Sequence, residues 1–353
     1  MKVRKAVITA AGRGTRQYPA SSTVQKEMFP LVDVDGLTKP TVQIIAEEAL
    51  DAGIEELCIV TAPGDEEMYR RHFRGLTEDL LPAFEGKEWA LQESERLACI
   101  EQALDYVTQP SPDGYGHAVY CTRDWVGAEP FLLLLGDHVY ISSDPQGRRC
   151  ARQVVDVFER TGQTVSAVKR TPERLLHLFG TVRGAPLGKE ALLPPDGERK
   201  EDRSLLPPNG GGQDGLYRVT AMVEKPSPER ATRELRTPGL APGEFLCFFG
   251  MQVFTPAIFD CLGYNIRYDV REKDEFQLTS AQALLAARQP YLAFEARGER
   301  FDMGVPFGLV ETQLALALNS PLREQMIASL IRILAEQGRG TAVARVPAGA
   351  TIP

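Results

Sequence analysis

The chain has 353 residues, of which 43% are hydrophobic and 25% are charged. That length suffices for one large domain or two ordinary ones, and the composition excludes a protein that is disordered over most of its length. The net charge of −8 excludes a nucleic-acid-binding surface over the molecule as a whole, while a local cationic pocket remains compatible with it.

Cysteine usage and hydropathy bear on the compartment. The six cysteines are scattered, form no CxxC pair with metal spacing, and several stand in apolar runs, which predicts core thiols in a reducing compartment. The apolar run at the N-terminus is too short for a signal peptide, and no run approaches the ~20 apolar residues of a membrane helix. We therefore expect a cytoplasmic protein with no nucleic-acid and no membrane partner.

Strands and helices alternate in the first part of the chain. We expect strands at 5–10, 55–63, 103–109 and 130–138, and helices at 41–53, 78–84, 88–102 and 117–127. The helix at 41–53 is expected to point Glu47 and Glu48 outward and to end at Gly53. This alternation predicts an α/β domain with a largely parallel sheet, whose strand ends and loops line one edge.

The pattern loosens after Cys150. We expect strands at 164–170, 180–184, 216–226 and 244–254, a Gly- and Pro-rich surface excursion over 184–216, and helices at 256–262, 277–289, 306–320 and 322–338. The last helix could cap the domain or pack against another subunit. One domain over 1–353 is expected, with a nucleotide-binding half (1–150), a sugar-binding half (151–310) and C-terminal helices (311–353).

A glycine-rich turn follows the first expected strand. The segment Gly12-Arg13-Gly14-Thr15-Arg16 lacks the Lys-Ser/Thr of a P-loop, and Gln17 stands where a dinucleotide fingerprint has its third glycine. Glycines after a strand still let the backbone approach a phosphate, and Arg16 adds a rigid cationic fork for phosphate oxygens. The segment therefore predicts an anion-binding loop, with an ordinary strand-to-helix turn as the alternative.

The wider segment "GRGTRQYPASSTVQKEMFPLVD" (12–33) resembles the signature of the nucleotide-sugar pyrophosphorylases, and more narrowly that of bacterial UTP–glucose-1-phosphate uridylyltransferases. Further blocks follow in the family's order: "YVTQPSPDGYGHAV", "FLLLLGDHVY", "LFGTVRG", "MVEKP", "GMQVFTPAIFDCL", "DEFQLTSAQALL" and "RFDMG". Single blocks such as "EKP" are weak, but their order over most of the chain makes the resemblance specific.

The resemblance implies an α/β fold with a Rossmann-like mixed, mostly parallel sheet flanked by helices and no C-terminal β-helix. It implies Mg²⁺-dependent transfer of UMP from UTP to glucose 1-phosphate, giving UDP-glucose and pyrophosphate by in-line attack without a covalent intermediate. Because the attacking sugar phosphate is already anionic, the reaction depends on positioning and charge neutralisation. The implied partners are a nucleoside triphosphate and a sugar 1-phosphate; a homo-oligomer is compatible with the sequence.

The site residues are carried over block by block. The resemblance gives catalytic roles to Arg16, Lys26 and Lys225, nucleotide contacts to Ala11, Gly12, Gly14, Gln109 and Gly114, sugar contacts to Gly180 and Glu224, and metal coordination to Asp137 and Asp302. Each cation could instead be a solvated surface residue, and each aspartate a turn or cap residue. Gln109 would read uracil because its amide offers one donor and one acceptor. His117 is expected to be structural.

Several positions depart from the family pattern. Ser21-Ser22 replaces Thr-Lys, Gln25 replaces a proline, "VDGLT" looks like an insertion before Lys39, and His138 stands where many relatives carry a second aspartate. The alternatives are a thymidylyl- or cytidylyltransferase acting on another sugar 1-phosphate, and a catalytically silent nucleotide-sugar sensor. A dinucleotide oxidoreductase is disfavoured by Gln17.

Overall fold

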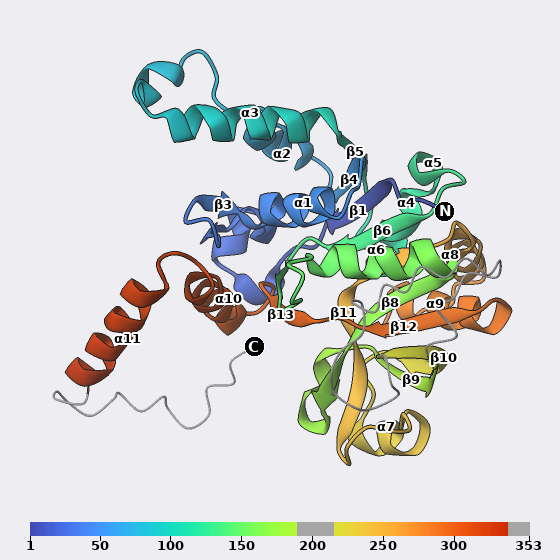
Figure 1. Ribbon diagram of the computed structural model, residues 1–353. Coiled ribbons are helices and arrows are strands. Elements are labelled where there is room, and N and C mark those ends of the chain that lie inside the picture. The colour runs from blue at the N-terminus through green and yellow to red at the C-terminus, as the bar shows by residue number, and fades with distance from the viewer. Residues whose placement is uncertain (189–214, 338–353) are drawn as a thin grey trace. The chain divides into compact units, whose positions relative to one another are not determined.

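The computed structural model describes residues 1–188 and 215–337 (Figure 1). Its contacts define two compact units, each made of separate stretches of chain. The large unit comprises Met1–Gly12, Ile45–Gly136 and Ser142–Arg300, and the small unit comprises Arg13–Ile44, Asp137–Ile141 and the chain from Phe301 onward. The assignment of separate nucleotide and sugar halves that divide at residue 150 stays a prediction.

A nine-stranded sheet forms the centre of the large unit, in the order β5-β4-β1-β6-β11-β8-β12-β10-β9. Its strands are β1 (Lys5–Ala10), β4 (Glu56–Thr61), β5 (Leu104–Thr108), β6 (Phe131–Leu135), β8 (Thr164–Pro172), β9 (Thr181–Pro186), β10 (Leu216–Val223), β11 (Glu244–Phe254) and β12 (Tyr291–Glu295). β5, β4, β1 and β6 are parallel, which confirms the predicted α/β arrangement of this half. The apolar runs that predicted β1, β4 and β6 are buried on both faces of the sheet, as inner parallel strands require, whereas the edge strand β5 is only partly buried.

The other half of the sheet is less parallel than expected. β11 runs antiparallel to β6, β8 and β9, and β10 runs antiparallel to β9 and β12, while β12 is parallel to β8. β10 and β11 therefore run opposite to the other strands of this sheet, while β8, β9 and β12 keep the direction of β6. An antiparallel neighbour needs no crossover helix, whereas a parallel connection needs a dozen or more residues, usually a helix. The fold is the predicted mixed α/β type.

Helices of the large unit are α2 (Glu66–Phe73), α3 (Glu88–Gln102), α4 (Tyr115–Cys121), α5 (Arg123–Val126), α6 (Cys150–Thr161), α7 (Pro228–Glu234), α8 (Ala257–Arg267) and α9 (Leu278–Arg288). The expected helix at 117–127 is two short helices, α4 and α5, and that at 78–84 is a single 3₁₀ turn at Leu81–Phe84. α6 was not predicted, although its buried residues recur at the spacing of an amphipathic helix.

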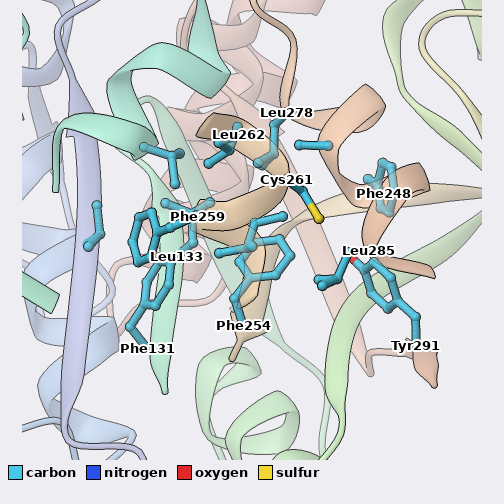
Figure 2. Close-up of a cluster of buried hydrophobic side chains, with 14 of the residues drawn as sticks. Phe131, Leu133, Phe248, Phe254, Phe259, Cys261, Leu262, Leu278, Leu285 and Tyr291 are labelled. Atoms are coloured by element: carbon cyan, nitrogen blue, oxygen red, sulfur yellow. The ribbon is translucent and has the colours of Figure 1, made fainter. Parts of the chain in front are cut away.

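Aromatic side chains fill the core between the sheet and α8 (Figure 2). The ring of Phe131 on β6 stacks on Phe259 of α8 with centroids 5.3 Å apart, and Phe254 lies 5.9 Å from Phe131. Tyr291 packs edge-on against Phe254, and its hydroxyl is hydrogen-bonded to Gln282 at 2.7 Å. Such aromatic pairs stabilise a core beyond the apolar area they bury, so this cluster fixes α8 and α9 on the sheet.

The small unit holds a hairpin, a strand pair and two helices. Its complete elements are β2 (Pro30–Val32), β3 (Thr38–Pro40), α10 (Pro306–Leu318) and α11 (Arg323–Gln337). Three further elements belong to it in part: β7 (His138–Ser142) except its last residue, the end of β13 (Gly298–Asp302), and the beginning of α1 (Thr41–Asp51), which ends in the large unit. Phe29, Leu31, Val139, Met303 and Leu316 form its apolar core together with Ile44. The inserted "VDGLT" makes the turn between β2 and β3, and the buried Lys39 ammonium pairs with Asp33 at 3.1 Å.

The expected excursion at 184–216 is only partly described. Residues up to Pro186 belong to β9, so its first residues are strand, and β10 begins at Leu216. Residues 189–214 lie outside the described part of the chain.

Four of the six cysteines, Cys58, Cys150, Cys247 and Cys261, are buried free thiols, as expected. Cys99 is exposed and Cys121 half-buried, so the core interpretation was wrong for these two positions, which lie on the outer parts of α3 and α4. In residues 1–188 and 215–337, no helix combines the length and the apolar character needed to cross a bilayer.

Glu47 and Glu48 on α1 are buried, which corrects the expectation that they point to solvent. Glu47 pairs with Arg96 of α3 at 3.1 Å. Glu48 accepts a hydrogen bond of 2.7 Å from the backbone N–H of Ala151 at the start of α6 and lies 3.6 Å from Arg149. Acidic side chains are stabilising at helix N-termini, so Glu48 caps the unpredicted helix α6.

Burial raises the pKa of Glu48 to about 7, although the Ala151 N–H and Arg149 oppose the shift. The folded protein therefore keeps a proton that the unfolded chain releases near the ordinary value of 4.5. Because the pKa is raised in the folded protein, the stability that this bound proton contributes is fully present below pH 4.5 and is lost as pH rises through about 7. Relative to wild type, Glu48→Gln is expected to gain about 3 kcal/mol in unfolding free energy over that range.

Urea unfolding of both proteins across this pH range measures the effect. The same substitution at the exposed Glu85 serves as the control and is expected to leave the pH profile unchanged. Parallel stability curves for wild type and Glu48→Gln would show that the carboxyl group titrates as an ordinary surface acid.

Candidate active site

The glycine-rich loop begins directly after β1. The first stretch of the large unit ends with Ala11, which is buried, and Gly12, which is exposed. Gly14 belongs to the small unit, where it precedes a 3₁₀ turn and has a φ of 58°. A Cβ on Gly14 would lie 3.1 Å from the Cβ of Ser21, so both the left-handed backbone and close packing require glycine. Gln17 donates to the carbonyls of Met303 and Val305, which explains a polar residue at this position without a dinucleotide.

Lys26 and Asp137 form a buried ion pair in the small unit. Lys26 Nζ lies 2.5 Å from Asp137 Oδ2, and Glu27 Oε1 lies 3.6 Å from the same ammonium. His138 Nδ1 lies 2.8 Å from Asp137 Oδ1. His138, at the position of the family's second aspartate, therefore binds the carboxylate of its neighbour. Both oxygens of Asp137 have a partner, and the carboxylate is held in one orientation.

Charge–charge interactions control the protonation of this group. Burial disfavours charge on Asp137, but Lys26 and His138 outweigh it and hold the pKa of Asp137 well below its ordinary value. Burial likewise opposes charge on Lys26, yet Asp137 and then Glu27 raise the pKa of Lys26. Burial raises the pKa of Glu27 to about 8 although Lys26 lowers it. The group is thus an ammonium–carboxylate pair beside a second acid, Glu27, whose ionisation is opposed by burial and favoured by Lys26.

Gly304 brings the remaining predicted residues of this unit together. A Cβ at this position would lie 2.8 Å from Asp137 Oδ2, 2.9 Å from Asp302 Oδ1 and 3.1 Å from Arg16 Nη2. The Gly304 N–H also donates to Asp302 Oδ1 at 2.7 Å. Any side chain at 304 would displace both carboxylates, so the glycine is required by the site. The "RFDMG" block contained this glycine, and sequence reasoning did not assign it a role.

The donor set of the small unit fits a hard divalent cation. Ligand atoms of Asp137, His138 and Asp302 lie within 4.8 Å of one another. Two carboxylates supply the oxygen donors that Mg²⁺ prefers, and each oxygen keeps a lone pair beyond its present hydrogen bond. The imidazole of His138 is already bound to Asp137, so the two aspartates are the better candidates as ligands.

In the large unit, Gln109 and Gly114 are in direct contact. Gln109 follows β5, is 5% exposed, and its side-chain Nε2 lies 3.1 Å from the Gly114 carbonyl oxygen and 3.2 Å from His117 Nδ1. Gly114 has φ of 108°, and a Cβ there would lie 2.9 Å from the backbone of Phe276. The loop therefore packs closely on the segment before α9, and that packing by itself requires Gly114.

A second group in the large unit contains the predicted sugar residues. Glu224 follows β10 and accepts a hydrogen bond of 2.6 Å from Thr279 of α9 at Oε2. A Cβ on the buried Gly180 would lie 2.8 Å from the same oxygen and 2.7 Å from the Phe248 ring. Thr279, which sequence reasoning missed although it stands in the "DEFQLTSAQALL" block, fixes Glu224 and leaves Oε1 facing Lys225 at 3.9 Å.

Lys225 has a backbone conformation that side chains disfavour. Its φ is 44°, in the left-handed region, while its ammonium side chain is 42% exposed. For a residue other than glycine this conformation costs about 1 kcal/mol or more. Strain retained at a lysine that few contacts hold in place is typical of a functional position.

Lys225→Gly is expected to separate activity from stability. Glycine adopts the left-handed backbone freely, so the unfolding free energy should stay within about 1 kcal/mol of wild type. Loss of the cation should lower kcat/KM by about 10²-fold, because a charge that neutralises phosphate disappears. Lys225→Ala, which keeps the strain, is the matched control: it should lose the same activity and be less stable than Lys225→Gly. Wild-type activity in both variants would remove Lys225 from the site.

Comparison with known proteins gives consistent results. The nucleotidyl transferase family profile matches residues 5–318. The UTP–glucose-1-phosphate uridylyltransferase of Bacillus subtilis (strain 168) is 35% identical over 332 residues, covering 92% of this chain and 95% of the relative. The enzyme of the same name from Streptococcus pneumoniae serotype 4 is 33% identical over 327 residues, covering 91% and 92%.

Solved structures resemble the chain over most of its length. A UDP-glucose pyrophosphorylase complexed with UDP-glucose has a TM-score of 0.66 and 27% identity, covering 89% of this chain and 98% of that one. A UTP-bound enzyme of the same kind from Acinetobacter baumannii has a TM-score of 0.69 and 26% identity, covering 94% and 99%.

Proposed function

Since the chain belongs to the nucleotidyl transferase family, we propose that it transfers UMP from UTP to glucose 1-phosphate, giving UDP-glucose and pyrophosphate. The chain is a nucleotidyltransferase, and relatives named for this reaction match it over most of their length. The observation that carries the proposal is the group of Arg16, Lys26, Asp137 and Asp302 around Gly304. Cations and carboxylates in one small group suit a reaction between two polyanions.

The reaction needs little proton transfer, because the attacking oxygen of the sugar phosphate is already anionic. We propose that Lys26 neutralises the phosphates of both substrates and that Arg16 binds the departing pyrophosphate. Lys26 is suited to this role because Asp137 and Glu27 keep it charged although it is buried. Stabilising developing charge with fixed cations in a place that excludes water is an effective form of catalysis.

Nucleotidyltransferases of this kind generally use a divalent metal ion, and we propose that the ion is Mg²⁺ held by Asp137 and Asp302. When bound, the ion supplies charge neutralisation for the phosphate oxygens of UTP. Asp137 is prepared for this role because its carboxylate stays ionised at any physiological pH.

The remaining residues of the proposal recognise the two substrates. We propose that Gln109 and Gly114 bind the uracil base, that the backbone of Ala11, Gly12 and Gly14 approaches the nucleotide, and that Gly180, Glu224 and Lys225 bind the sugar phosphate. Glu224 accepts from Thr279 at one oxygen, so its other oxygen is oriented for a sugar hydroxyl. We also propose that residues 1–353 act as one nucleotidyltransferase domain, located in the cytoplasm.

Pyrophosphate release across a grid of substrates tests the proposal. The grid combines UTP, dTTP, CTP, ATP and GTP with several hexose 1-phosphates in the presence of Mg²⁺. The expected result is a dominant rate for UTP with glucose 1-phosphate. A dominant rate for another pair would assign another substrate to the same chemistry. Absence of turnover together with UDP-glucose binding would replace the enzyme with a nucleotide-sugar sensor.

A further inference from the structure

The orientation of the Gln109 amide is determined by its neighbours. A carbonyl oxygen can only accept a hydrogen bond, so the group 3.1 Å from the Gly114 oxygen must be the amide nitrogen of Gln109. The opposite orientation would place two acceptors face to face. The choice between amide oxygen and nitrogen therefore follows from the backbone of the loop.

His117 accepts the second hydrogen of the same amide. Its Nδ1 lies 3.2 Å from Gln109 Nε2, and because the amide nitrogen is a donor, Nδ1 must present its lone pair. The ring is then neutral with its proton on Nε2, which lies 3.9 Å from Cys121 Sγ one turn further along α4. Both amide hydrogens of Gln109 are thus occupied.

The only polar atom of this side chain left for a ligand is the oxygen. Within residues 1–188 and 215–337 we find no hydrogen-bond donor to Gln109 Oε1. Gln109 therefore presents an acceptor alone, and not the donor–acceptor pair expected from its residue type. Uracil offers a donor at N3, whereas N3 of cytosine is an acceptor. An acceptor that faces N3 distinguishes the two bases, because uracil makes this hydrogen bond and cytosine cannot.

The loop that carries both partners of the amide is fixed from outside. The Phe276 N–H donates to the Asp113 carbonyl at 2.8 Å, and the Gly116 N–H donates to the Phe276 carbonyl at 2.8 Å. A Cβ on Gly116 would lie 2.7 Å from the Phe276 oxygen, so the two segments are in close contact. The His117 ring also lies near the Phe276 ring, with centroids 6.5 Å apart. The amide is held before any ligand arrives.

We propose that His117 is the positioning residue for base recognition: through Nδ1 it locks the Gln109 amide so that only its oxygen meets the base. This inference rests on the proposed function, in which Gln109 binds the base of UTP. It also revises the structural role expected for His117 from the sequence.

Two substitutions at His117 separate the hydrogen bond from packing. His117→Asn keeps an acceptor near the position of Nδ1, and His117→Leu removes it while retaining apolar bulk. For each protein kcat and KM are measured with UTP and with CTP, and KM is measured for glucose 1-phosphate. We expect His117→Leu to lower the preference for UTP over CTP by about tenfold, through KM of the nucleotide. KM for glucose 1-phosphate should not change, and His117→Asn should restore the preference.

The outcomes distinguish this inference from the proposed function. If wild type shows no preference for UTP over CTP, the proposed function fails and the inference fails with it. If wild type prefers UTP and His117→Leu prefers it equally, only the inference is overturned.

A second measurement does not depend on how the variants fold. The chain has four histidines, so their ring nitrogens are resolvable in ¹⁵N-labelled wild-type protein by long-range ¹H–¹⁵N NMR correlation. We expect the His117 signals, assigned through His117→Asn, to show the proton on Nε2 at neutral pH. A proton on Nδ1 would overturn the inference.

Discussion

Asp137→Asn is expected to lower kcat by at least about 10³-fold, because the carboxylate proposed to hold the metal ion loses its charge. The substitution keeps the size and shape of the side chain while it removes the negative charge, so the loss reports mainly on charge. Binding of Mn²⁺ as a spectroscopic probe, followed by electron paramagnetic resonance without substrate, should weaken in parallel. The exposed Asp79→Asn variant is the control, with wild-type rate and metal affinity.

The same variant tests how the buried pair contributes to stability. Removing one charge of a buried ion pair lowers the free energy of unfolding by about 3 kcal/mol or more. The Lys26 ammonium still has the Glu27 carboxyl group as a neighbour, 3.6 Å away, so we expect the fold to survive. The double variant Lys26→Met with Asp137→Asn removes both charges and should recover stability without recovering activity. Substantial turnover by Asp137→Asn, with metal affinity unchanged, would contradict the metal assignment.

Lys26→Met is expected to lower kcat by about 10²- to 10³-fold, the usual effect of removing one preorganised group that stabilises developing charge. The methionine fills a similar volume, so the change isolates the ammonium. KM for either substrate should change less than kcat, since the charge acts most strongly as the new bond forms. Steady-state pyrophosphate release measures both constants.

A matched surface control distinguishes a specific effect from a general loss of charge. Lys2 is an exposed lysine paired with Glu55, and Lys2→Met should behave as wild type. Lys26→Arg is informative as well, because the planar guanidinium cannot occupy the space between Asp137 and Glu27 as a compact ammonium does. A kcat for Lys26→Met within a factor of two or so of wild type would remove Lys26 from the phosphate-binding group.

The sequence predicted those strands and helices that are marked by a pattern within their own residues. Uniform apolar runs predicted β1, β4 and β6, and regular apolar spacing predicted α3 and α9 almost to the residue. The burial of Glu48 could not be predicted in the same way, because its partner is the N-terminus of α6, 103 positions further along the chain. The direction of β11 also depends on pairing with strands distant in the chain.

The site was predictable as a set of residues and not as a set of orientations. The blocks identified Lys26, Asp137 and Asp302, and the structure places these three together in one unit. That Gln109 presents only an acceptor depends on the backbone of Gly114 and on His117, which no residue type reveals. Gly304 was assigned no role from the sequence, although its missing side chain is what admits both carboxylates.

The small unit is assembled from three stretches of chain, and each contributes to its charged group: Lys26 from the first, Asp137 from the second and Asp302 from the third. The sheet of the large unit is complete once β12 ends at Glu295. During synthesis, a growing chain therefore contains every strand of its main sheet before it contains both carboxylates. Contacts between stretches so far apart in sequence form slowly in folding. Products that end before residue 302 would therefore contain every strand of the main sheet while lacking one proposed ligand.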